Sequence, residues 1–252
     1  RNCFMKIIIS PAKKMNTDTD TLAPKGLPVY LDKTEQLLER LRALSYPEAK
    51  ALWKCNDKIA ALNYERVGNM DLRTSLTPAV LSYEGIQYQY MAPAVMEDSQ
   101  LEYLENHLRI LSGFYGILKP FDGVAPYRLE MQAKLRTDRG NDLYGFWDRL
   151  LYENLTADTD CILNLASKEY SRCIERYLEP DMRYVTVVFG ELRDGKIIQK
   201  GTLAKMARGE MVRYMAEHQV EDVEQIRSFD RLSFHYAPEY SDEKKMVFLL
   251  RS

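Results

Sequence analysis

The stretch MKIIISPAK, residues 5–13, places a run of β-branched side chains directly before a proline. Isoleucine favours extended backbone, because its branched side chain packs well on a pleated surface. Proline cannot donate a backbone hydrogen bond, and it biases the residue before it away from the helical region. The stretch therefore predicts a short buried strand over 6–9 that ends at Ser10, with Lys13 and Lys14 just beyond its end.

Helical and extended patterns are mixed along the rest of the chain. Apolar spacing predicts helices over 32–46, 57–67, 98–113, 142–155, 168–178 and 202–217. Extended segments are predicted over 78–85, 161–167, 184–199, 231–237 and 245–250. These elements do not follow a strict βαβ repetition, so we expect the α+β (mixed α/β) class, with a mixed sheet flanked by helices.

In the helix over 57–67, the residues Ile59, Leu62 and Val67 are expected to face inward. In the segment over 184–199, Asp194 and Gly195 are expected to supply the positive φ angles of a tight hairpin.

The composition fits a single folded domain. The chain has 252 residues, of which 46% are hydrophobic, which is enough to bury a sizeable core. No stretch rich in proline, glycine and serine divides it, so we expect one compact domain over 5–252. Residues 1–4, before Met5, are interpreted as an upstream extension or a remnant of cloning.

The charges nearly cancel, which limits the classes of partner. The chain carries 35 Lys and Arg against 37 Asp and Glu, for a formal charge of −2. Global charge therefore predicts no attraction to nucleic acid, and an anionic partner needs a local concentration of basic groups. The four cysteines form no CxxC pair and the apolar runs are short, so we expect a protein of the reducing cytoplasm with no membrane partner.

Four segments place polar or basic residues where a predicted strand or helix ends. The candidates in these segments are Ser10 and Lys13; Lys119, Tyr127, Arg128 and Glu130; Asn164, Ser167, Glu169 and Tyr170; and Lys205, Arg208 and Arg213. Strand ends and helix N-termini often gather in one crevice, where backbone N–H groups and helix dipoles favour an anion. We therefore expect a positively charged cleft that binds phosphate.

Each segment also has a purely structural interpretation. The SPAK stretch can be a plain turn after a strand, and Ser167 can be the N-cap of the helix that it opens. Arg128 and Glu130 lie on one face of an extended segment, so they can pair with each other. The basic residues of 202–217 can form a solvated helix face.

Metal and cofactor chemistry has little support in the sequence. The three histidines, His107, His218 and His235, do not stand at spacings that place two metal ligands on one helix face. No GxSxG, Walker A or GxGxxG motif is present. We therefore expect no metal site and no cofactor, and no catalytic residue is assigned.

Five motifs in order resemble the YaaA family of bacterial peroxide-stress proteins. They are ISPAK (9–13), HLRILSGFYGILKPFDGVAPYRLEM (107–131), GNDLYGFW (140–147), NLASKEY (164–170) and AKMARGEM (204–211). The resemblance implies a cytoplasmic protein needed under hydrogen peroxide stress, which limits unincorporated iron and the DNA damage that iron causes. It further implies a compact α/β fold with a positively charged cleft, DNA binding and a helix-hairpin-helix element.

If residues 108–120 resemble a helix-hairpin-helix, Leu108 and Leu111 anchor the first helix. The corner from Gly113 to Gly116 would then approach a phosphate through its backbone N–H groups. Arg109 and Lys119 would add charge on either side of this corner. The glycines, however, are spaced GxxG instead of GxG, and Pro120 disfavours a regular second helix.

Two functions remain open at this point. The first is DNA binding without sequence preference, with phosphate contacts from Lys13, Arg109, Lys119, Arg128, Lys205, Arg208 and Arg213. The alternative is an enzyme acting on a nucleotide or nucleobase held in the same cleft, and its ligand-pocket candidates are Ser10, Tyr127, Glu130, Asn164, Ser167, Glu169 and Tyr170. A small phosphate-bearing ligand is compatible with both, and the oligomeric state stays open.

Overall fold

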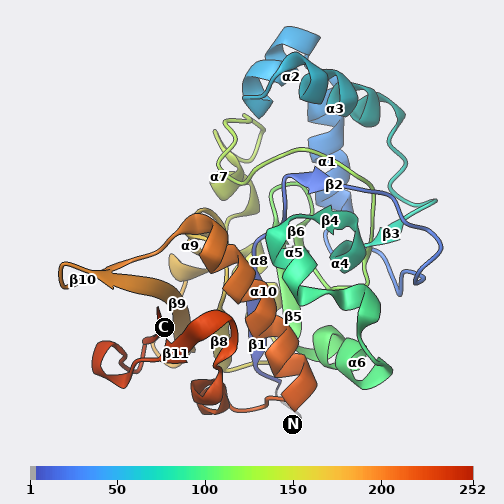
Figure 1. Ribbon diagram of the computed structural model, residues 1–252. Coiled ribbons are helices and arrows are strands. Elements are labelled where there is room, and N and C mark those ends of the chain that lie inside the picture. Colours follow the sequence, from blue (N-terminus) through green and yellow to red (C-terminus); the bar gives the residue numbers. More distant parts are fainter. Residues whose placement is uncertain (1–3, 252) are drawn as a thin grey trace.

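The predicted strand at Lys6–Ile9 (β1) lies in the middle of the main sheet (Figure 1). It pairs in parallel with β5 (Leu108–Ser112) on one side and β8 (Cys161–Asn164) on the other. Its three isoleucines are fully buried. The computed structural model describes residues 4–251, so residues 1–3 of the predicted extension lie outside the described residues.

The remaining strands extend this sheet in both directions. From β8 it continues through β9 (Arg183–Arg193) and β12 (Lys245–Leu250), both parallel additions, to the antiparallel β11 (Phe234–Tyr236). From β5 it ends at the antiparallel β6 (Gly116–Leu118). A short strand, β10 (Lys196–Ile198), returns along β9 as a hairpin. The sheet is therefore mixed, and the predicted fold class is confirmed.

Helices surround the sheet, and short paired strands connect them. The helices are α1 (Leu31–Arg42), α2 (Tyr46–Trp53), α3 (Asp57–Asn69), α4 (Ala79–Ser82), α5 (Ile86–Met91), α6 (Asp98–His107), α7 (Leu143–Trp147), α8 (Leu150–Thr156), α9 (Lys168–Glu175) and α10 (Gly201–His218). Four 3-10 turns lie at Pro93–Val95, Val223–Ser228, Arg231–Ser233 and Pro238–Tyr240. The small strand pairs join β2 (Lys14–Met15) to β4 (Tyr83–Glu84) and β3 (Thr77–Pro78) to β7 (Gly123–Val124).

Figure 1 shows α2 and α3 at one end of the molecule and the long α10 lying beside α5. The contact between α10 and α5 is close, because a Cβ atom at Gly209 would lie 2.1 Å from the backbone oxygen of Gln87. One hydrophobic core connects the two ends of the chain, from Met5 to Phe248. Within residues 4–251, no helix is both long and apolar enough to cross a membrane.

Several local predictions are confirmed. The hairpin of β9 and β10 turns at Asp194 and Gly195, whose φ angles are 51° and 74°. The last two strands pair with each other, and α10 covers the helix predicted over 202–217. The segment over 161–178 forms a buried strand followed by a helix, as expected.

The helix predicted over 98–113 is wrong in its second half. The helix α6 ends at His107, and the next five residues form the buried strand β5. A strand buried on both faces has a nearly continuous apolar run, which periodicity cannot distinguish from a buried helix. Residues 108–120 therefore form a strand, a turn and a strand, and the expected helix-hairpin-helix is wrong for this segment.

The glycine corner of that segment is closed to a phosphate. Phe114 and Tyr115 are fully buried at the turn. Gly116 has a φ of 79°, and a Cβ atom there would lie 2.8 Å from the Trp147 ring. The two glycines thus allow tight packing of β5 and β6 against neighbouring side chains, and not the approach of a ligand.

Three smaller predictions also differ from the structure. The segment over 78–85 forms the short helix α4 and only three strand residues, Pro78 of β3 and both residues of β4. The helix predicted over 142–155 is interrupted at Asp148, whose φ of 48° leaves the helical region. Leu62 is 48% exposed, because α3 turns Ala60 and Asn63 towards the interior instead.

Candidate functional site

A pocket of about 500 Å³ lies where β1 and β8 end, next to α5, α9 and α10. We call it the SPAK pocket, and it is lined by Ser10, Pro11, Ala12, Lys13, Lys14, Glu84, Gly85, Ile86, Gln87, Tyr88, Tyr127, Arg128, Leu129, Glu130, Ser167, Glu169, Tyr170, Lys205 and Arg208. Because β1 and β8 are parallel neighbours, their carboxyl ends meet at the same edge of the sheet. Ten of the fourteen predicted site residues line this pocket.

Hydrogen bonds between the two strand ends hold the floor of the SPAK pocket. The Ser167 backbone N–H donates to Ser10 Oγ over 2.8 Å, and Ser10 Oγ donates to Ser167 Oγ over 3.1 Å. The Tyr88 hydroxyl donates to the Ser10 carbonyl over 2.8 Å. Ser167 is the N-cap of α9, as expected, but its side chain makes no capping hydrogen bond. The N-terminal end of α9 therefore lies beside the pocket without a side-chain cap.

Two arginines of the pocket lack an internal partner. Burial lowers the pKa of the Arg208 guanidinium, and no carboxylate among residues 4–251 offsets that shift. The Nε atom of Arg128 is buried and has no hydrogen-bond partner within the described residues. Both arginines are partly buried, and a partly buried cation without a carboxylate partner favours an incoming anion.

The lysines of the pocket differ in their environments. Lys13 pairs with Glu130 over 3.0 Å, so the pairing of Arg128 with Glu130 is not what the structure contains. The Lys13 side chain is still 68% exposed, and such a pair contributes little to stability. Lys205 is exposed on the first half of α10. Both ammonium groups thus remain accessible from solvent.

Acidic and phenolic groups complete the lining of the pocket. Burial raises the pKa of Glu169, and the neighbouring Glu130 carboxylate raises it further. Burial also raises the pKa of Tyr170, and it raises the pKa of Tyr127 to about 12. Tyr127 Oη lies 2.6 Å from Ser112 Oγ within the core. The pocket therefore combines cations with a buried carboxyl group and protonated phenols.

Four predicted residues lie elsewhere. Asn164 is buried, where its Oδ1 accepts the Ala166 N–H over 2.9 Å, so it stabilises the end of β8. Arg213 has turned away from the pocket around α10 and pairs with Glu217 over 2.7 Å. Arg109 and Lys119 line a different cavity of about 370 Å³, which we call the Arg109 pocket; its walls also include Lys25, Leu27, Val29, Glu105 and Asp122.

The residues of α5 were not expected at the site. Gln87 and Tyr88 both line the SPAK pocket. No chemical motif marks this helix, and its position depends on the close contact at Gly209. The one signal in the sequence was Gly209 itself, within AKMARGEM, because a glycine inside a helix often permits a close approach of a neighbouring backbone.

Residues 4–251 contain no cluster of three His, Cys, Asp or Glu side chains arranged to hold a metal ion. One of the histidines has a clear structural role. His107 is buried and its Nδ1 lies 2.7 Å from the Met5 carbonyl oxygen, to which it donates. Burial lowers the pKa of His107, which favours the neutral ring.

The protein thus has a mixed sheet flanked by helices, with a pocket of charged and phenolic side chains at one edge of the sheet. The sequence profile of the family described as peroxide stress protein YaaA matches residues 5–240. The chain is 60% identical to a UPF0246 protein of Lachnoclostridium phytofermentans, over 97% of this chain and 96% of that protein. It is 59% identical to a UPF0246 protein of Desulfitobacterium hafniense, over 97% and 98% of the two chains. The chain therefore belongs to the YaaA family of peroxide stress proteins.

Proposed function

We propose that this peroxide stress protein binds a phosphate-bearing ligand of nucleotide size in the SPAK pocket. The observation that carries the proposal is the pair of arginines at the pocket. Arg128 has a buried Nε atom without a hydrogen-bond partner among the described residues. Burial lowers the pKa of Arg208, and no carboxylate of residues 4–251 offsets that shift. A phosphate oxygen forms charge-assisted hydrogen bonds with a guanidinium, and these are stronger than neutral ones. The uncapped first turn of α9 adds a positive end of a helix dipole.

The size of the pocket favours a small ligand over a duplex. A volume of about 500 Å³ falls within the range of small-molecule sites, whereas a duplex needs an open groove. Glu169 and Tyr170 supply hydrogen-bonding groups of the kind that contact a base or a sugar. Of the two functions left open by the sequence, the geometry therefore gives more support to a nucleotide or nucleobase ligand.

Catalysis on such a ligand has one supporting observation. Glu130 is paired with Lys13, whereas burial raises the pKa of Glu169. Two neighbouring carboxyl groups with different environments are typical of a general acid and a general base. On this proposal Glu169 and Glu130 are the two candidate carboxyl groups for acid and base catalysis.

DNA binding is the second candidate function, and the exposed lysines at the pocket rim support it. The side chains of Lys13 and Lys14 are 68% and 80% exposed, and Lys205 is also exposed. Such groups can contact backbone phosphates of DNA without sequence preference. On this proposal the protein would limit iron-dependent oxidative damage by binding DNA, as the family resemblance implies.

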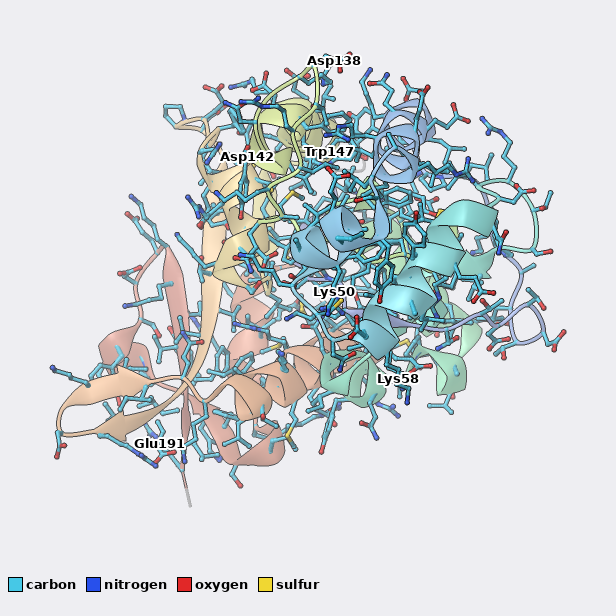
Figure 2. The ribbon with its side chains drawn as sticks, turned by 90° about the horizontal axis from the view of Figure 1, so that it is seen from above. Lys50, Lys58, Asp138, Asp142, Trp147 and Glu191 are labelled. Carbon is cyan, nitrogen blue, oxygen red and sulfur yellow. The ribbon has the colours of Figure 1, made fainter. Side chains whose placement is uncertain are left out.

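The test compares one charge reversal at the rim with a matched reversal elsewhere. Lys205→Glu changes an exposed lysine of the pocket, and Lys58→Glu changes an exposed lysine on α3 (Figure 2). The four ribonucleoside monophosphates are titrated by calorimetry. At least one should bind, and Lys205→Glu should weaken it about tenfold or more, because a charged hydrogen bond contributes about 1.5–3 kcal/mol. Lys58→Glu should leave the affinity unchanged.

The two candidates give different results in this experiment. If no monophosphate binds at millimolar concentration, or if both variants weaken binding equally, the nucleotide proposal is wrong. A 20-base-pair duplex is titrated in parallel over a range of salt concentrations. The DNA proposal requires a salt-dependent affinity whose slope becomes about one unit shallower in Lys205→Glu. Absence of duplex binding at low salt removes the DNA proposal and leaves the first one standing.

A further inference from the structure

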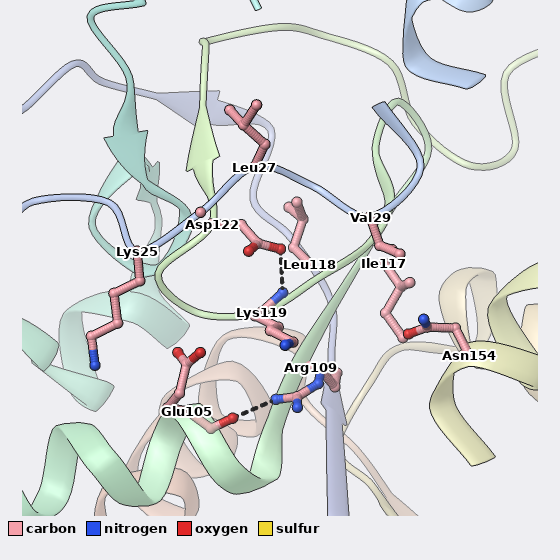
Figure 3. A pocket seen from close by; sticks show the side chains of 11 residues that line it. Lys25, Leu27, Val29, Glu105, Arg109, Ile117, Leu118, Lys119, Asp122 and Asn154 are labelled. Atoms are coloured by element: carbon pink, nitrogen blue, oxygen red, sulfur yellow. Dashed lines mark hydrogen bonds between the residues drawn. The ribbon is translucent and has the colours of Figure 1, made fainter. Parts of the chain in front are cut away.

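The Arg109 pocket is separate from the SPAK pocket, since the two share no lining residue. It lies beside β5 and β6, between α6, α8 and the loop before α1 (Figure 3). Its volume of about 370 Å³ is at the lower end of the range for small-molecule sites. Nothing in the proposed function uses this cavity.

One side of the Arg109 pocket carries charges of both signs. Figure 3 shows the three cations Lys25, Arg109 and Lys119 around Glu105, whereas Asp122 lies beside Leu118 and accepts the Lys119 backbone N–H. Within residues 4–251, no ion pair joins any two of these side chains. Charged neighbours elsewhere on the protein do pair, as Arg149 and Glu179 do over 2.9 Å. Burial lowers the pKa of Arg109, and the Glu105 and Asp122 carboxylates partly offset that shift. The charges of the cavity therefore attract one another without forming direct ion pairs.

Two of these groups are held in place and still have capacity for a ligand. Arg109 Nη1 donates to the carbonyl oxygens of Glu105 and Leu108 over 2.8 and 2.7 Å, which fixes the guanidinium and leaves its other nitrogens for another acceptor. The Oε2 atom of Glu105 is buried and has no hydrogen-bond partner among the described residues. A buried carboxylate oxygen without a donor is costly, so a cationic donor from a ligand would be stabilising.

The other side of the cavity is apolar. Leu27 and Val29 are 47% and 55% exposed, and they lie together at the mouth of one cavity, whereas exposed apolar side chains elsewhere are usually scattered singly. Figure 3 shows them with Ile117 and Leu118 on the side away from Glu105. The cavity thus has a charged half with both signs and a hydrophobic half.

We propose that the Arg109 pocket binds a free α-amino acid with an apolar side chain. The ligand ammonium donates to Glu105, and the ligand carboxylate accepts from Arg109 and Lys119. The ligand side chain packs against Leu27 and Val29. A ligand with a single charge would pair either with the cations or with the Glu105 carboxylate, and would leave the other group without a partner.

The test uses ligands that differ in one charge at a time. The parent protein is titrated by calorimetry with L-leucine, L-methionine and L-phenylalanine. Each of them is compared with its amide, which lacks the carboxylate, and with its N-acetyl form, which lacks the ammonium. At least one free amino acid should bind, and both of its modified forms should bind about tenfold more weakly or worse. If none of the three amino acids binds at about 10 mM, roughly the weakest useful affinity, the proposal is overturned. It is also overturned if the modified forms bind as well as the free amino acid.

Variants then locate the binding to this cavity. Glu105→Gln keeps the shape of the side chain and removes its charge, and Lys119→Met removes the cation. Each should weaken the amino acid about tenfold or more. Glu102→Gln is the matched control, because Glu102 is exposed on the same helix and does not line the cavity. Circular dichroism confirms that each variant is folded, and a folded Glu105→Gln with parental affinity also overturns the proposal. Nucleotide titrations of the same variants report on the SPAK pocket separately.

Discussion

Replacing Arg208 by methionine should separate the stability of the fold from ligand binding. Arg208 lies on α10 at the SPAK pocket, and burial lowers its pKa without a carboxylate to offset the shift. Methionine is unbranched and flexible, so it keeps much of the packing of the arginine stem while removing the charge. The substitution therefore removes a group that is unfavourable for folding and favourable for binding an anion.

The two effects can be given magnitudes. Replacing buried charged groups by apolar ones of similar volume often stabilises a protein by about 1–4 kcal/mol. Arg208 retains some exposure, so we expect the lower end, about 1 kcal/mol. Loss of a charge-assisted hydrogen bond to phosphate costs about 1.5–3 kcal/mol, which weakens binding roughly 10- to 150-fold.

Urea unfolding followed by circular dichroism measures the stability, and calorimetry measures the affinity for the monophosphate that binds best. Arg213→Met is the control on the same helix, because Arg213 pairs with Glu217 over 2.7 Å and does not line the pocket. It should lose no more than about 1 kcal/mol of stability and keep the parental affinity. If Arg208→Met instead loses more than about 1 kcal/mol and binds as the parent does, Arg208 is a structural residue and the reasoning is refuted.

Two further predictions concern stability alone. Burial raises the pKa of Asp122 from 3.8 to about 6. Above pH 6 the ionised carboxylate therefore destabilises the fold by about 3 kcal/mol, and this penalty disappears as the pH falls towards 4. In urea unfolding, Asp122→Asn should therefore be more stable than the parent protein by about the same free energy at pH 7.5, and as stable as the parent at pH 4. A gain in stability that does not change with pH would contradict the raised pKa of Asp122. Gly209→Ala should lower the free energy of unfolding by about 2 kcal/mol or more, because its Cβ would lie 2.1 Å from the Gln87 carbonyl oxygen. Gly201→Ala on the same helix is the control, since its Cβ would meet no atom within 4 Å, and it should be neutral or slightly stabilising. Equal thermal stabilities of these two glycine variants would contradict the close contact of α10 and α5.

The parts of the fold with strong local signals could be predicted from the sequence. The isoleucine run before Pro11 predicted β1, and the Asp194-Gly195 pair predicted the hairpin of β9 and β10. In both cases the deciding property is local: β-branching and proline in the first, and access to positive φ in the second. The pairing partners of β1 were not predictable, because they are set by contacts distant in the sequence.

The strand β5 shows why one prediction failed. Its residues continue the apolar pattern of α6 without a break, and only their position between β1 and β6 makes them extended. The interactions of the sheet here override the local helix preference. The expected DNA-binding corner depended on that helix, so a single error in secondary structure removed Gly113 and Gly116 from the site.

The candidate site was predictable where residues follow parallel strands. Ser10 follows β1 and Ser167 follows β8, so the rule that parallel strands end at one edge brings them together. Arg109 and Arg213 could not be assigned in this way. The direction of their side chains depends on strand pairing for Arg109 and on the rotation of α10 for Arg213, and neither is visible in a single sequence.

The central position of β1 has a consequence for the synthesis of the protein. Ile7 pairs with Leu108 on one side and Leu163 on the other, so β1 leaves the ribosome long before either neighbour exists. At about 5–20 residues per second, roughly 10–30 s pass between the translation of β1 and that of β8. Until β5 and β8 have been made, the apolar isoleucine segment of β1 lacks both of its neighbouring strands.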